Sequence, residues 1–102
     1  APGGAGLVAC ADEILSTVPA GAEGTCAGSL GTPGYDGYAG TSMATPHVAG
    51  VAALLTAQGR SRADVVRILK QTARTPGTGL RGVYTPVYGH GIVDAAAAVA
   101  AQ

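Results

Sequence analysis

Apolar and polar residues alternate early in this chain and merge into a long apolar run near its middle. Residues 14–18 alternate, which predicts a strand that Pro19 ends. Residues 35–39 predict a second strand, antiparallel to the first, and the Gly- and Pro-rich residues 19–34 predict an enlarged hairpin loop. The apolar run then predicts a helix over about residues 41–58. Its apolar side chains point in nearly every direction, which indicates a helix buried on all sides.

The second half of the chain predicts two further helices. Ser61 followed by Asp64 is typical of a helix start, and the helix is expected to run to about residue 72. One face of this helix is expected to pack on a core: Val65, Val66, Leu69 and Ala73. Asp94 is expected to cap a short Ala-rich helix that reaches Ala101.

Ser42 is the first candidate for chemistry, because it lies at or just inside the start of the helix predicted from residue 41. The first N–H groups of a helix lack internal partners, and the helix dipole makes this end positive. A serine hydroxyl there could attack an electrophile beside a donor for the resulting oxyanion. Two other interpretations stay open. Thr41 or Ser42 could be an ordinary N-cap, or the helix start could bind an anion such as phosphate.

Two motifs resemble a known family. Residues 40–50, Gly-Thr-Ser-Met-Ala-Thr-Pro-His-Val-Ala-Gly, resemble the nucleophile motif of the subtilisin-like serine proteases. Residues 88–91, Tyr-Gly-His-Gly, resemble the turn before the family's last helix. The resemblance implies an α/β fold, with residues 1–102 as the C-terminal portion of a three-layer domain. In such a domain a parallel sheet is flanked by helices, and a β-hairpin leads into the nucleophile helix.

The resemblance also implies residue roles. Ser42 would be the nucleophile of a serine endopeptidase that forms an acyl-enzyme, and its backbone N–H would donate to the oxyanion. Tyr38 and Met43 would border the leaving-group side of the substrate cleft, and local packing is the alternative role for both. Met43, expected to be exposed beside the serine, would be open to oxidation.

A serine needs a base, and the histidines of this chain are poor candidates. His47 lies five residues after Ser42, about 500° of rotation along a helix, so it cannot share the same face. We expect His47 to be a core or supporting residue and His90 to lie at the surface. In the family the Asp and His of the triad precede the serine by a long way. The chain is therefore expected to act with an N-terminal part of the same protease on a polypeptide substrate.

A competing hypothesis is a catalytically inactive remnant or pseudo-protease that serves as a structural or interaction module. Composition fits a slice of a larger protein, because Trp and Phe are absent and the apolar residues are mostly Ala and Val.

All six Lys and Arg residues fall within 60–102, mainly on one amphipathic helix, and no nucleic-acid partner is expected. Polar residues within the apolar run argue against a membrane span. The chain is expected to carry no signal peptide and to belong to a secreted protein.

Cys10 and Cys26, the two cysteines, flank the first predicted strand. In a secreted protein such cysteines are expected to pair, and a bridge would contribute about 3 kcal/mol on the chain-entropy model. Free buried thiols or half of a metal site are the alternatives. No Cys-x-x-Cys or His cluster supports a metal, no carboxylate cluster supports calcium, and no cofactor is expected.

Overall fold

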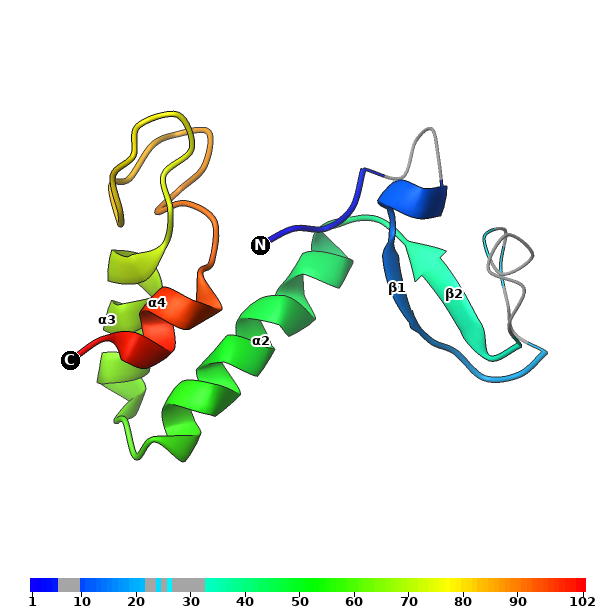
Figure 1. Ribbon diagram of the computed structural model, residues 1–102, viewed down its shortest axis with the longest axis horizontal. Coiled ribbons are helices and arrows are strands. Elements are labelled where there is room, and N and C mark those ends of the chain that lie inside the picture. Colours follow the sequence, from blue (N-terminus) through cyan, green and yellow to red (C-terminus); the bar gives the residue numbers. More distant parts are fainter. Residues whose placement is uncertain (6–9, 22–23, 25, 27–32) are drawn as a thin grey trace. The chain divides into compact units, whose positions relative to one another are not determined.

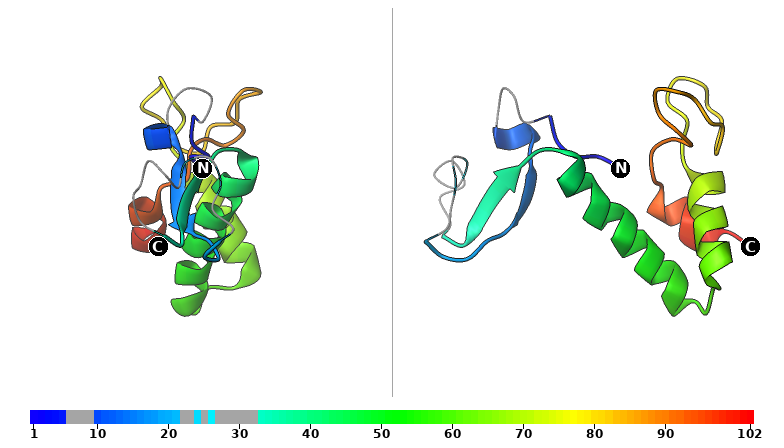
Figure 2. Two further views of the ribbon diagram at one scale, coloured as in Figure 1. Left: turned by 90° about the vertical axis from the view of Figure 1, so that its right-hand side faces the viewer. Right: turned by 180° about the vertical axis from the view of Figure 1, so that it is seen from behind.

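The computed structural model describes residues 1–5, 10–21, 24, 26 and 33–102, and these divide into two compact units. The N-terminal unit spans Pro2–Pro46, and the C-terminal unit comprises His47–Gln102 with Ala1. Figures 1 and 2 show the elements in chain order. Most of the predicted hairpin loop lies outside the described residues.

The N-terminal unit is built on the predicted hairpin. A short 3-10 helix, η1 (Cys10–Asp12), precedes strand β1 (Ile14–Thr17), which pairs antiparallel with β2 (Tyr35–Tyr38). In the register Ile14 lies opposite Tyr38 and Thr17 opposite Tyr35. The hairpin is thus confirmed. Within the described residues this two-stranded antiparallel sheet is the whole sheet, so the expected parallel sheet is not seen here.

Helix α2 (Thr41–Ala57) ends within one residue of its predicted end, but its burial was predicted wrongly. Only Val51 and Leu55 are buried, whereas Leu54 is 52% exposed. The apolar composition of a helix predicts that it will be covered, but the covering must come from other elements. In the described chain those elements reach one side of α2 only.

The core of the C-terminal unit joins α2 to α3 (Arg62–Thr72) and α4 (Ala95–Ala100). Its buried residues come from all three helices: Val51, Leu55, Val65, Ile68 and Ala98. Figure 1 shows α4 lying against α3. None of the described helices is long and apolar enough to cross a bilayer.

Both predicted helix caps are present. The Ser61 side chain accepts a hydrogen bond from the Asp64 N–H at 3.2 Å, and Asp94 accepts one from the Ala97 N–H at 3.0 Å. The predicted face of α3 needs one correction: Val66 is 46% exposed, and Ile68 is buried in its place. Successive helix residues are about 100° apart, so Val66 points away from the face that Val65 and Ile68 share.

Candidate nucleophile site

Ser42 is the second residue of α2 and is exposed to solvent. The turn into the helix is made by Gly40, whose φ of 144° favours glycine. The Gly40 carbonyl accepts hydrogen bonds from the N–H groups of Met43 at 3.0 Å and Ala44 at 3.3 Å. These bonds close the first turn, so Ser42 has the predicted position at a helix start.

The N–H groups of Thr41 and Ser42 donate no hydrogen bond to any described residue. They are the unpaired donors that begin an α-helix, and the helix dipole adds partial positive charge at the same place. The Ser42 hydroxyl likewise makes no hydrogen bond within the described chain. An exposed hydroxyl beside unpaired N–H donors suits nucleophilic attack with stabilisation of an oxyanion.

A contact that the sequence did not reveal fixes this turn from behind. The Gly40 N–H donates to the Gly3 carbonyl at 2.7 Å, and a Cβ on Gly3 would overlap the Gly40 carbonyl oxygen. Gly3 thus packs directly on the turn before Ser42. Gly3 permits this close approach because it has no Cβ, and the pairing of distant segments has no local sequence signal.

The role of Asp36 was also not predicted, because the sequence alone shows only that this residue is acidic. It is fully buried on β2 and accepts hydrogen bonds from the Gly37 N–H at 2.8 Å and from the Gly24 N–H. A buried carboxylate is tolerated when N–H donors satisfy it. Asp36 therefore ties the described part of the hairpin loop to the strand that leads to Ser42.

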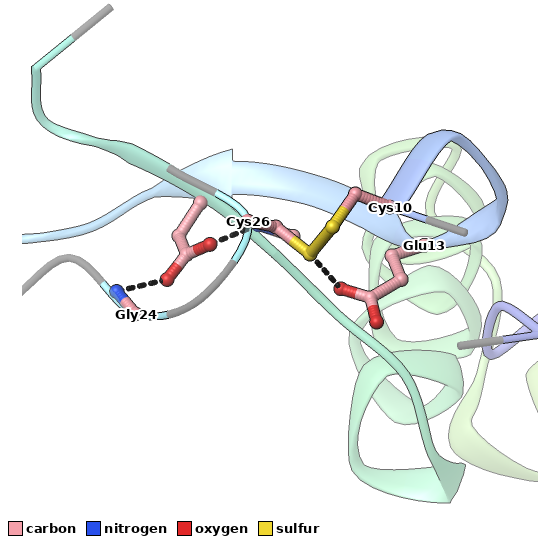
Figure 3. Close-up of a disulfide and its surroundings, with 6 residues drawn as sticks. Cys10, Glu13, Gly24 and Cys26 are labelled. Carbon is pink, nitrogen blue, oxygen red and sulfur yellow. Dashed lines mark hydrogen bonds between the residues drawn. A yellow bond between two sulfur atoms is a disulfide. The ribbon is translucent and has the colours of Figure 1, made fainter. Parts of the chain in front are cut away.

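The predicted Cys10–Cys26 disulfide is present, with the two Cα atoms 5.5 Å apart (Figure 3). Cys26 is buried, and a Glu13 carboxylate oxygen lies 3.1 Å from its sulfur. The bridge joins η1 to the loop between β1 and β2. It therefore constrains the same hairpin that leads to Ser42, at two positions earlier in the chain.

The other predicted site residues have mixed outcomes. Tyr38 ends β2 four residues before Ser42 and is 44% exposed, so it is accessible to a ligand. Met43 follows Ser42 and is partly buried rather than openly exposed. His47 is exposed, which contradicts a core position in this chain. Among the described residues, no side chain that could act as a base is hydrogen-bonded to the Ser42 hydroxyl.

His90 was expected at the surface but is partly buried. Its Nδ1 lies 3.1 Å from the Gly82 carbonyl oxygen. Its ring packs edge-on against the Tyr84 ring, with the two ring centroids 5.5 Å apart. The flanking Gly89 and Gly91 have φ values of 59° and 116°, as the predicted tight turn requires. No group of three or more His, Cys, Asp or Glu side chains that could hold a metal is found among the described residues.

The model of the Subtilase family matches residues 1–97 of the chain. The chain belongs to the subtilase family. The matched residues include Ser42, on the turn described above. Subtilase membership gives the α/β fold class and a protease family, although the described residues do not build the complete three-layer arrangement.

Three relatives illustrate the similarity of this subtilase chain. Thermitase from Thermoactinomyces vulgaris is 53% identical over 49 residues, covering 47% of this chain and 18% of that protein. An extracellular protease of Xanthomonas campestris pv. campestris is 42% identical over 92 residues, covering 87% of this chain and 14% of that protease. Alkaline elastase YaB from a Bacillus species is 41% identical over 99 residues, covering 93% of this chain and 21% of the elastase. The chain thus spans about a fifth or less of these relatives. No solved structure is significantly similar to it.

Proposed function

We propose that this chain supplies the nucleophile Ser42 of a secreted serine endopeptidase. The observation that carries the proposal is an exposed serine in the subtilase motif beside the unpaired N–H groups of Thr41 and Ser42. Secretion is supported by relatives that are named extracellular proteases. The substrate class is polypeptide, as for the protease family.

The reaction would begin with attack of the Ser42 oxygen on a peptide carbonyl carbon, while a base takes the hydroxyl proton. The negative charge that develops on the carbonyl oxygen would be held in part by the Ser42 N–H. The amine would then leave with a proton from the base, and water would release the acyl group from Ser42. Tyr38 and Met43 would border the leaving-group side of the cleft.

The base and its orienting aspartate would come from an N-terminal part of the same protease, with residues 1–102 forming the C-terminal part of one domain. Two observations support this. The relatives are about five times longer than the matched segment or more, and the described residues place no base on Ser42. The exposed side of α2, which includes Leu54, offers an apolar surface for that part to cover.

Hydrolysis of a peptide substrate by the complete protein tests the proposal. We expect Ser42→Ala to lower kcat by about 10⁶-fold, the size measured for the same change in subtilisin itself. Ser16→Ala, which removes an exposed hydroxyl from β1, is the matched control and should keep full activity. Equal activity of Ser42→Ala and the parent would refute the nucleophile. An inactive parent with all segments present would favour the structural module instead.

A further inference from the structure

A second candidate site lies in the C-terminal unit, whereas Ser42 belongs to the N-terminal one. It is a hollow of about 260 Å³ lined by Arg74, Arg81 and residues of the turn 75–80. Both arginine side chains are largely exposed, at 60% and 46%. The residues that line the hollow follow α3 in the chain, in the yellow segment of Figure 1.

The backbone places the two arginines on the same face. Arg74 forms an antiparallel bridge with Arg81 and another with Ile92. Residues directly opposite in an antiparallel pair point to the same side, and like charges placed in this way repel. Asp94, two residues after Ile92, lies between them, with its carboxylate 3.0 Å from Arg81 Nη1 and 3.7 Å from Arg74 Nε. One carboxylate against two guanidinium groups leaves one net positive charge.

Much of the hydrogen-bonding capacity around the hollow is unused. Arg81 donates hydrogen bonds from Nη1 to the Thr72 carbonyl at 2.7 Å and to the Asp94 carboxylate. The Arg74 guanidinium makes no hydrogen bond to any described residue, and neither the Gly77 nor the Gly79 N–H donates one within the described chain. A planar guanidinium with free backbone N–H groups nearby matches the geometry of carboxylate and phosphate oxygens.

We propose that this hollow is an oxyanion-binding site, in which Arg74 and the free N–H groups of Gly77 and Gly79 hold a carboxylate or phosphate group. The volume is slightly below the range of pockets for drug-sized ligands, so the ligand is small. Leu80, which is 55% exposed, lines the same hollow and gives it an apolar side. Two sources carry the required chemistry: the free carboxylate of a peptide end, and inorganic phosphate.

The test is an NMR titration of the complete protein labelled with ¹⁵N-glycine, in which the Gly77 and Gly79 amide signals are followed at constant ionic strength. The probes are sodium phosphate, N-acetylleucine and the uncharged N-acetylleucinamide. We expect saturable shifts with at least one oxyanion and none with the amide. The oxyanion that binds more tightly identifies the source.

Arg74→Gln is expected to raise the Kd by about 10-fold or more, because a hydrogen bond to a charged group is lost. Arg62→Gln removes an exposed charge from α3 and should leave the Kd unchanged. The Gly91 signal reports whether each variant keeps the fold. No saturable shift with either oxyanion, or an unchanged Kd in folded Arg74→Gln, would overturn the site. Ser42 takes no part in this binding, so the outcome is independent of the proposed peptidase.

Discussion

The C-terminal unit encloses apolar side chains of α2, α3 and α4, whereas the buried side chains of the described N-terminal unit are Cys26 and Asp36. One unit is therefore stabilised mainly by the burial of apolar surface. The other depends on a disulfide, a buried carboxylate bonded to N–H groups, and the backbone pairing of β1 with β2. Ser42 belongs to the second unit, in which the described links are mainly covalent and polar.

The largest expected effect is on the apolar core. Leu55→Ala should destabilise the C-terminal unit by about 3–4 kcal/mol, because Leu55 is fully buried and a cavity would remain. Leu54→Ala, at the neighbouring exposed position, should cost less than about 1 kcal/mol in the chain alone. Denaturant unfolding followed by circular dichroism measures both. Similar losses for the two variants would contradict the assignment of the core.

The disulfide comes next. Replacing Cys10 and Cys26 together by Ser should destabilise the N-terminal unit by about 3 kcal/mol, because the unfolded chain regains the freedom of the closed loop. Amide hydrogen exchange should quicken at β1 and β2 while protection in α3 stays the same. If α3 lost protection to the same extent, the two units would not be stabilised separately.

A glycine pair tests how closely the last turn packs on Arg74. A Cβ on Gly91 would overlap the Arg74 carbonyl oxygen, whereas a Cβ on Gly89 would meet open space. Both have positive φ, so each Ala variant is strained, but Gly91→Ala must also move backbone. We expect a loss of about 2 kcal/mol for Gly91→Ala and about 1 kcal/mol for Gly89→Ala in thermal unfolding. Equal losses would contradict the close approach.

The smallest effect concerns pH. The Ala97 N–H, and after it Arg81, lower the pKa of Asp94 below its ordinary 3.8 by hydrogen bonding to its charged form. A lowered pKa in the folded state gives stability that is present above the ordinary pKa and is lost as the pH falls below about 4. Asp94→Asn should flatten the acid side of the stability curve of the C-terminal unit. Part of the slope should persist, since Arg67 and Ser61 lower the pKa of Asp64 too. An unchanged slope in Asp94→Asn would refute this contribution.

Features with local chemical signals could be predicted from the sequence. The caps at Ser61 and Asp94, the paired glycines around His90 and the alternation in β1 each depend on residues a few positions apart. The cysteine pair was also found, because two cysteines on either side of one strand allow few arrangements. The position of Ser42 at the start of α2 followed from the motif and its helix-forming continuation.

Features that depend on distant segments could not be predicted. The contact of Gly3 with Gly40, the burial of Asp36 and the exposure of α2 are all decided by which other elements come close. The apolar composition of α2 predicted complete burial, yet the described chain covers only the side with Val51 and Leu55. The mistaken assignment of Val66 to the packed face of α3 has a simpler cause. Val66 is next to the buried Val65 in sequence but about 100° away from it around the helix.

The central claim is that Ser42 becomes a nucleophile only with a base from another segment. A fluorophosphonate probe reacts covalently with an activated serine, and mass spectrometry locates the modified residue. We expect modification at Ser42 in the complete protein, none in residues 1–102 alone, and none in the Ser42→Ala variant. Modification at a different serine, or equal modification of Ser42 in residues 1–102 alone, would contradict the account.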